Sequence, residues 1–348
     1  MKIAVGLSGG VDSSVVAYLL KKEGHDVVGV RMNLFPGNAN SEDDDARKVA
    51  DHLGIEYLSI DMEQEYHENV IKYIKSEYLS GRTPNPCIIC NRFLKFGLFL
   101  DKVLESGLEF DMFATGHYAI IEKNEKINRY ELKKGSNSDK DQAYFLSMLT
   151  QDQLSRIIFP LGRMNKKDVK KIAADAGLFT ADKKESQDLC SGDYRDFLEK
   201  NNSTGNFIDK EGKVLGNHEG IENYTIGQRR GLGLSSPGEP YYVLSIDAEN
   251  NNVIIGYNRD LLSSTMVVGK INWGAVEKPQ FPLDVQVKIR YRDNGIAGRI
   301  EKKLDNGNHL IYFSEERRAV TPGQLAVFYD NDTVLGAAFI EASQHINN

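Results

Sequence analysis

The chain has 348 residues, with 43 basic and 50 acidic side chains, a formal net charge of −7 and 41% hydrophobic residues. This composition is typical of a soluble globular protein long enough for two or three domains. No apolar run approaches the roughly eighteen residues that a membrane span needs, and the first residues match neither a signal peptide nor a transit peptide. We therefore expect a cytoplasmic protein with no membrane partner.

The first half of the chain alternates between the patterns of buried strands and of helices with one apolar face. In chain order, we expect strands at residues 3–7, 26–32, 56–60 and 111–115, and helices at residues 13–22, 43–53, 65–79 and 165–176. Such alternation predicts a parallel sheet with helices on both faces, and ligands bind such sheets at the carboxyl ends of the strands.

After about residue 203 the pattern changes to short alternating runs separated by turns. The clearest predicted strands lie at residues 241–246, 253–255, 284–290, 309–313 and 324–329. We expect an α/β domain over residues 1–203, a small β domain over 204–265 and a second small β domain over 266–348. A single β domain of about 140 residues is the alternative to the boundary near residue 265.

The strongest local motif is Leu-Ser-Gly-Gly-Val-Asp-Ser-Ser, at residues 7–14 between the first predicted strand and helix. Its glycines let the backbone wrap an anion closely, and Ser8, Ser13 and the amides at the helix start offer hydrogen-bond donors. The motif lacks the lysine of a Walker loop and the glycine spacing of a dinucleotide-binding loop. It therefore predicts a phosphate-binding loop and disfavours kinase-like and hydride transfer. A glycine turn with capping serines and no ligand is the structural alternative.

The three cysteines are too few for a disulfide scaffold, and an odd number favours chemistry or metal binding. Cys87 and Cys90 lie in a proline-rich stretch before a helix that we expect to begin near residue 93. Arg92 gives Cys90 the electropositive setting that favours a reactive thiolate. Cys190 lies in a polar stretch, and we expect both cysteine segments to be exposed loops.

A metal site is the alternative to free thiols. One C-x-x-C pair and one distant cysteine leave a structural zinc site one ligand short. Three thiolates with an open fourth position suit an iron–sulfur cluster that binds an additional ligand such as sulfide. The residues alone leave cluster and free thiols both open.

Eight short motifs occur in an order and spacing that resemble those of the tRNA-specific 2-thiouridylases, a family of pyrophosphatase-loop ATPases. They lie at residues 8–13, 83–91, 114–119, 140–146, 185–190, 224–233, 290–292 and 321–324. The resemblance covers nearly the whole chain. It implies an α/β fold with a Rossmann-like parallel-sheet domain of the adenine nucleotide alpha hydrolase type, followed by two small β domains of which the last is a β-barrel.

The resemblance also implies a reaction. ATP, with Mg²⁺, would adenylate the C2 oxygen of the wobble uridine in tRNAs, with those for lysine, glutamate and glutamine expected. A persulfide on Cys190 would then deliver sulfur to C2, and Cys90 would act as the nucleophile that releases it, giving a Cys90–Cys190 disulfide. The products would be 2-thiouridine, AMP and pyrophosphate, and a cysteine desulfurase or a relay protein would donate the sulfur.

Three sets of site residues follow from the same resemblance. ATP contacts are expected from Gly6, Leu7, Ser8, Gly9, Gly10, Val11, Asp12, Ser13, Met32 and Gly116, with Asp12 suited to magnesium or to the leaving pyrophosphate. The target base is expected to lie against Asn85, Pro86 and Cys87. Contacts to the rest of the tRNA are expected from His117, Lys140, Asp141, Gln142, Arg290, Tyr291 and Gln324. We also expect the basic stretch at residues 160–184 to follow tRNA phosphates.

One residue departs from the family pattern, since many members carry Asp where this chain has Cys87. A thiol weakens any acid or base role at this position, and it completes a trio with Cys90 and Cys190. A [4Fe-4S] cluster on these three cysteines is therefore an alternative sulfur carrier. Two other functions remain open: an adenylating synthetase of the same loop class that acts on a small substrate, and an ATP-responsive RNA-binding module without catalysis.

The residues assigned to tRNA also have structural alternatives. His117 is alternatively a hydrogen-bonded histidine at a strand end, and residues 140–142 are alternatively a helix cap and first turn. Arg290 and Tyr291 are alternatively ordinary strand residues, and Gln324 alternatively serves only a turn.

Overall fold

The computed structural model describes residues 1–35, 41–183, 203–236 and 238–344. These residues form two compact units. The first contains those within 1–70, 87–189 and 332–334, and the second contains those within 71–86, 190–331 and 335–348. No helix among the described residues is long and apolar enough to cross a membrane.

The first unit is built on a five-stranded parallel sheet with the order β3-β2-β1-β4-β7. Its elements are β1 (Lys2–Gly6), α1 (Val11–Lys22), β2 (Asp26–Asn33), α2 (Ser41–Leu53), β3 (Glu56–Asp61), α3 (Glu63–Tyr66), α5 (Pro86–Ile89), η2 (Cys90–Leu98), α6 (Phe99–Glu105), β4 (Met112–Ala114), β5 (Ala119–Asn124), β6 (Arg129–Lys134), η3 (Ser138–Lys140), α7 (Ala143–Leu146), α8 (Gln151–Ser155), β7 (Ile157–Ile158), α9 (Lys166–Asp175) and η4 (Phe179–Asp182).

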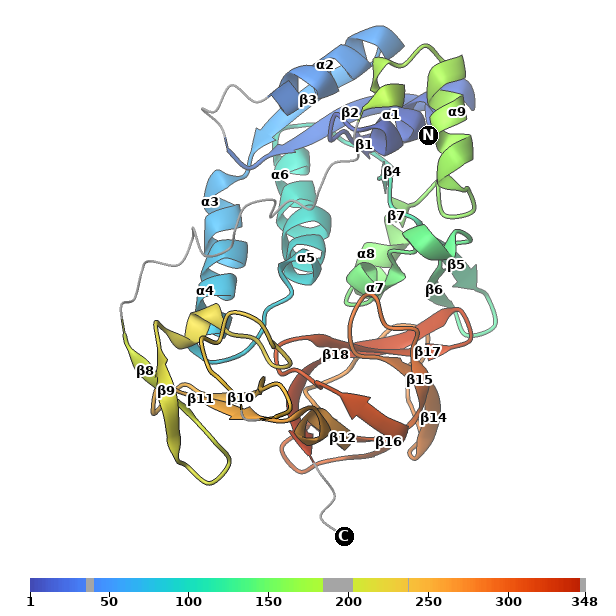
Figure 1. Ribbon diagram of the computed structural model, residues 1–348. Coiled ribbons are helices and arrows are strands. Elements are labelled where there is room, and N and C mark those ends of the chain that lie inside the picture. The colour runs from blue at the N-terminus through green and yellow to red at the C-terminus, as the bar shows by residue number, and fades with distance from the viewer. Residues whose placement is uncertain (36–40, 184–202, 237, 345–348) are drawn as a thin grey trace. The chain divides into compact units, whose positions relative to one another are not determined.

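The sheet is covered on both faces, as expected for parallel strands rich in Val and Ile. Ile3 and Val5 of β1 pack into one apolar cluster with residues of α1, α2 and α9, and Figure 1 shows these three helices on the same face. The opposite face packs against the cysteine-bearing helix. There the ring of Phe113 in β4 contacts Phe96 of η2 and Phe99 of α6, with centroid distances of 5.9 and 6.1 Å.

The described residues of the second unit form the helix α4, a four-stranded sheet and a closed barrel, with short 3₁₀ segments between strands. Its elements are α4 (Lys72–Leu79), β8 (Gly205–Ile208), β9 (Val214–His218), η6 (Ile221–Asn223), β10 (Tyr242–Asp247), β11 (Asn252–Gly256), η7 (Asn258–Leu261), β12 (Leu262–Val268), β13 (Asn272–Trp273), β14 (Leu283–Lys288), β15 (Ile296–Lys303), β16 (His309–Arg318), β17 (Leu325–Asp330) and most of β18 (Thr333–Gln344). The helical segment η1 (His67–Ile71) joins α3 to α4 across the boundary between the units.

The barrel closes because β12 pairs with both β16 and β18. The strand order β12-β16-β15-β14-β17-β18 therefore returns to β12. Alternate residues of these strands face inward and fill the interior, among them Val268, Ile300, Ile311, Phe328 and Ile340, all fully buried. The small sheet has the order β10-β11-β8-β9 and its own core around Phe207 and Val253.

The predicted α/β domain, the small β domains and the terminal barrel are confirmed. Several features differ from the expected elements. The helix expected over residues 65–79 is divided into α3, η1 and α4. The helix expected to begin near residue 93 already begins at Pro86, and the hairpin β5–β6 was not predicted. The domain boundaries at 203/204 and 265/266 stay a prediction.

Candidate functional site

The glycine loop joins the end of β1 to the start of α1. Ser13 holds the loop together, because its Oγ donates to the carbonyl of Gly10 at 3.1 Å and accepts from the amide of Ser8 at 3.1 Å. Gly9 has a φ of +74°, a conformation that favours glycine. The first amides of α1 have no acceptor within the helix, so they and the helix dipole are available to an anion.

Three other predicted ATP residues, Gly6, Met32 and Gly116, lie at the same edge of the sheet. Gly6 is in register with Val30 of β2, and Met32 lies two residues further along that strand. Gly116 follows β4 and is pressed against the start of α1. A Cβ at Gly116 would lie 2.8 Å from the Cβ of Asp12 and 3.0 Å from the amide of Ser13. The structure therefore brings Gly116 to the glycine loop, and this position has room only for glycine.

Asp12 is held by two residues that were not predicted to belong to the site. The hydroxyl of Tyr118 donates to Asp12 Oδ1 at 2.7 Å. The Lys166 ammonium, at the first residue of α9, lies 2.8 and 2.7 Å from the two carboxylate oxygens. The side chain of Lys166 is only 12% exposed. The ion pair with Asp12 therefore holds the Lys166 ammonium beside the glycine loop.

A second lysine, Lys183, also contacts the glycine loop. Lys183 donates to the carbonyl of Gly9 at 3.0 Å and forms an ion pair with Asp45 of α2. The hydrogen bond from Lys183 lowers the pKa of the Asp45 carboxyl below its ordinary value. Both lysines belong to the basic stretch that we expected to follow tRNA phosphates. Lys166 and Lys183 contact the glycine loop, and their positive charges suit a polyphosphate there. Contact of the basic stretch with tRNA phosphates stays a prediction.

Cys87 and Cys90 lie within a helix, and not in the exposed loop that the prolines suggested. Cys90 is 2% exposed and Cys87 is half-buried, so the prediction of an exposed Cys90 is wrong. Pro86 is the first residue of α5, a position that proline favours because its missing amide hydrogen is not needed there. Cys90 then begins η2, a helical segment with wide π-type turns.

A glutamine from α8 supports these wide turns. Gln153 Nε2 donates to the carbonyls of Arg92 and Phe96, at 2.6 and 2.9 Å. Gly97, which directly follows Phe96, has non-helical backbone angles. The two bonds from Gln153 therefore give the carbonyls next to this irregularity a hydrogen-bond donor. Wide helical turns often occur at functional sites. Gln153 is therefore a supporting residue of the cysteine-bearing helix, and no motif in the sequence signalled it.

His117 links the segment after β4 to the cysteine-bearing helix. Its ring packs between Phe96 of η2 and Phe159, with centroid distances of 5.7 and 5.5 Å. Its Nδ1 lies 2.6 Å from Thr115 Oγ1. Burial among these rings, with a smaller contribution from the charge of Lys95, lowers the pKa of His117 well below its ordinary value. The imidazole is therefore neutral near pH 7.

The segment from Thr115 to Tyr118 thus connects two parts of the candidate site. Gly116 and Tyr118 contact the glycine loop through Asp12, whereas His117 contacts Phe96 of η2, the helical segment whose first residue is Cys90. All of these contacts lie within the first unit.

Comparison with known proteins assigns the chain to a family. Residues 1–191 match the model of a tRNA methyl transferase HUP domain, 195–257 a tRNA methyl transferase PRC-barrel domain, and 263–340 an aminomethyltransferase beta-barrel domain. The tRNA-specific 2-thiouridylase MnmA of Acetivibrio thermocellus is 42% identical, over 98% of this chain and 99% of that protein. MnmA 1 of Caldanaerobacter subterraneus is 44% identical, over 98% of both chains.

The chain belongs to the tRNA-specific 2-thiouridylase family. The descriptions of two matched domain models mention methyl transfer, but the relatives that match the chain over its full length are thiouridylases. The resemblance stated from the motifs is therefore confirmed.

The family motif at residues 140–142 has internal contacts in this structure. Asp141 is buried, and its Oδ1 accepts from the amides of Gly135 and Ala143 at 3.0 and 3.1 Å. Gln142 exchanges two hydrogen bonds with the backbone of Tyr118, through its side-chain oxygen and through its amide, both at 2.9 Å. Gln142 therefore supports Tyr118, which in turn holds Asp12. A tRNA contact by residues 140–142 stays a prediction.

The remaining predicted tRNA residues lie in the second unit. Arg290 and Tyr291 are in the turn after β14, not in the strand, and the Arg290 guanidinium donates to the carbonyl of Arg318 at 2.7 Å. Gln324 Nε2 donates to the carbonyls of Thr83 and Pro84, both at 3.1 Å. Asn85 is buried, and Pro86 begins α5. Their roles toward tRNA stay predictions.

The third cysteine, Cys190, lies outside the described residues, so the pairing of Cys90 with Cys190 and the three-cysteine cluster stay predictions. Among the residues that the structure does describe, no group of three His, Cys, Asp or Glu side chains is placed to hold a metal ion.

Proposed function

We propose that this protein is an ATP-dependent tRNA 2-thiouridylase that acts on the wobble uridine of tRNAs for lysine, glutamate and glutamine in the cytoplasm. The relatives that match it over its full length are named tRNA-specific 2-thiouridylases, which supports the thiolation of tRNA. The observation that carries the proposal within the structure is the Thr115–Tyr118 segment, which contacts both the glycine loop and the helix that begins with Cys90.

ATP, taken as its magnesium complex, is the first substrate. Its phosphates would lie on the amides of the glycine loop and the first turn of α1, where the helix dipole favours an anion. Lys166 and Lys183 would contribute positive charge, because each is already held against the loop. The C2 oxygen of the uridine attacks the α-phosphorus of ATP, the bond between the α-phosphorus and the bridging oxygen breaks, and pyrophosphate leaves. The uridine then carries AMP as a leaving group at C2.

Sulfur transfer forms the second half of the proposed reaction. The terminal sulfur of a Cys190 persulfide attacks C2, and the C2–O bond to AMP breaks. The Cys90 thiolate then attacks Sγ of Cys190, breaks the S–S bond and leaves one sulfur on C2. The products are 2-thiouridine, AMP and a Cys90–Cys190 disulfide, which a dithiol reductant returns to two thiols. A cysteine desulfurase or a relay protein reloads Cys190 with sulfur.

An unpaired anticodon base can be moved into a protein pocket at a small free-energy cost. Such a base is not stacked within a duplex, so moving it into a protein pocket costs only a few kcal/mol. The three-domain division at residues 203 and 265 belongs to the same proposal, with the two β domains contacting the rest of the tRNA.

Pyrophosphate release tests the proposal against its rivals. Purified protein is incubated with MgATP, and pyrophosphate is measured with and without unmodified tRNA and a persulfide donor, while 2-thiouridine is quantified by mass spectrometry. We expect pyrophosphate and 2-thiouridine only when tRNA is present. Pyrophosphate release with a small carboxylate or amide in place of tRNA would assign a different synthetase activity, and tRNA binding without pyrophosphate release would assign a binding module.

A further inference from the structure

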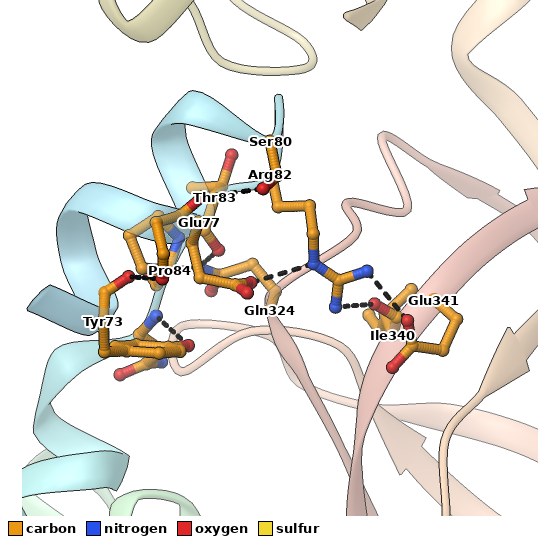
Figure 2. Close-up of polar contacts among 11 residues, drawn as sticks. Tyr73, Glu77, Ser80, Arg82, Thr83, Pro84, Gln324, Ile340 and Glu341 are labelled. Atoms are coloured by element: carbon orange, nitrogen blue, oxygen red, sulfur yellow. Dashed lines mark hydrogen bonds and ion pairs between the residues drawn. The ribbon is translucent and has the colours of Figure 1, made fainter. Parts of the chain in front are cut away.

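The loop that precedes the cysteine-bearing helix is attached to the barrel through an arginine. Arg82 lies between α4 and α5, and its guanidinium bonds in three directions, as Figure 2 shows. Nε donates to Glu77 at 2.9 Å, Nη1 donates to Glu341 of β18 at 2.8 Å, and Nη2 donates to the carbonyl of Ile340 at 3.3 Å. The planar guanidinium thereby fixes its own orientation relative to α4 and β18.

The next two residues of the loop are bound by the turn that precedes β17. The amide of Thr83 donates to the carbonyl of Pro322 at 2.9 Å, and Gln324 Nε2 donates to the carbonyls of Thr83 and Pro84. Gly323 has a φ of +88°, and a Cβ there would lie 2.7 Å from the Thr83 carbonyl oxygen. Because a primary amide has only two N–H groups, both donors of Gln324 are used by this loop.

Asn85, the first residue that is predicted to contact the target base, is also held by contacts within this unit. The amide of Asn85 donates to the hydroxyl of Tyr73 at 3.4 Å, and the Tyr73 ring lies 6.4 Å from the ring of Phe339 in β18. Residues 82–85 are therefore bound on both sides by α4 and by the barrel. All of these contacts lie within the second unit.

We propose that Arg82, Glu341 and Gln324 form a clamp that positions the loop carrying Asn85 and Pro86 for the target uridine. Gln324 is then a positioning residue that acts through this loop, in place of the direct tRNA contact expected from the motifs. The inference deepens the proposed function, because it assumes that the loop meets the target base. Its consequence is that the barrel controls the geometry of the base pocket.

The first test separates positioning from tRNA binding. In Gln324→Glu, a carboxylate faces two carbonyl oxygens, so the loop is released. We expect kcat for thiolation to fall by about tenfold to a hundredfold, the scale expected for a misplacement of about 1 Å, with little change in the tRNA Kd. Gln280→Glu, an exposed glutamine that precedes β14, is the matched control. A raised tRNA Kd with an unchanged kcat at saturation would overturn the clamp in favour of direct contact.

The ion pair is tested with a matched surface pair. Glu341→Gln removes one partner of Arg82, whereas Arg299→Gln removes one partner of the exposed pair between Arg299 and Asp284. We expect Glu341→Gln to lower kcat and Arg299→Gln to leave it unchanged. Equal effects of the two variants would contradict a specific role of Arg82 and Glu341.

Thiol labelling provides a readout that does not need activity. Cys87 follows the loop directly and is half-buried, so release of the loop would expose it to iodoacetamide. Fragment masses assign the label to Cys87 or Cys90. We expect faster Cys87 labelling in Gln324→Glu and Glu341→Gln than in the two controls. Faster labelling in a protein that does not thiolate tRNA would refute the proposed function and retain the clamp, whereas unchanged labelling would refute the clamp.

Discussion

The ammonium of Lys166 lies 2.8 and 2.7 Å from the two carboxylate oxygens of Asp12, although 154 positions separate the two residues in the chain. Asp12 lies in the first turn of α1 and Lys166 is the first residue of α9. The contact places a largely buried cation beside the loop that is proposed to bind the phosphates of ATP. It also ties together two helices that share one face of the sheet.

Loss of the Lys166 charge is expected to weaken ATP binding. In Lys166→Gln, we expect the KM for ATP to rise about tenfold or more, because a hydrogen bond to a charged group contributes about 1.5–3 kcal/mol. Steady-state pyrophosphate release at varied MgATP measures this change. Lys167→Gln, at the exposed neighbouring residue of α9, is the control. A KM equal to that of the control would show that Lys166 has only a structural role.

Gly116 is expected to tolerate no side chain. In Gly116→Ala, the added Cβ would approach Asp12 to 2.8 Å, so the start of α1 must shift. Overpacking of this kind costs about 1–3 kcal/mol and would distort the glycine loop. We expect ATP binding, measured by calorimetry, to be lost while the circular dichroism spectrum is retained. Gly238→Ala provides the comparison, since no heavy atom lies within 4 Å of its added Cβ. Normal ATP affinity in Gly116→Ala would exclude this loop as the ATP site.

The buried His117 is expected to make stability dependent on pH. Burial lowers its pKa below the ordinary value of 6.5, so the unfolded chain binds more protons than the folded protein below that pH. The stabilisation is complete above pH 6.5 and decreases as the pH falls. His218 and His309 contribute with the same sign, because burial lowers the pKa of each.

We therefore expect the fall in Tm between pH 7.5 and pH 5.5 to be smaller in His117→Gln than in the wild type. Differential scanning calorimetry at both pH values measures the change, and the exposed His67 provides a control as His67→Gln. An equal or larger fall in His117→Gln would show that the imidazole is already protonated in the folded protein.

Local sequence patterns predicted β1, α1, β2, α2, β3 and α9, because each of these elements has an apolar pattern that fits its type. The contact between Lys166 and Asp12 had no local signal, since it depends on how α9 returns to the sheet. The basic stretch was therefore assigned to tRNA, whereas two of its lysines contact the glycine loop.

The cysteine segment shows why its local structure could not be predicted from the sequence. Two prolines predicted a stiff loop, but Pro86 is the first residue of α5, where proline is well tolerated. The burial of Cys90 depends on packing of the following helix against β4, and a local motif does not report such packing. Likewise, the role of Gln324 depends on a loop 240 residues away in the chain.

The central claim is that two cysteines divide the sulfur transfer between them, with Cys190 carrying the sulfur and Cys90 releasing it. The most direct measurement is a single-turnover reaction of the wild type, Cys90→Ser and Cys190→Ser, each with tRNA, MgATP and a persulfide donor. The iron content of each protein is determined as well. We predict that the active wild-type protein contains no iron. Cys90→Ser is expected to stop at a covalent adduct in which the persulfide sulfur of Cys190 is bonded to C2 of the uridine, whereas Cys190→Ser forms no adduct. Both variants are expected to release pyrophosphate when tRNA is present, and neither is expected to give 2-thiouridine. Thiolation at the wild-type rate by either variant, or activity that follows the iron content, would contradict this claim.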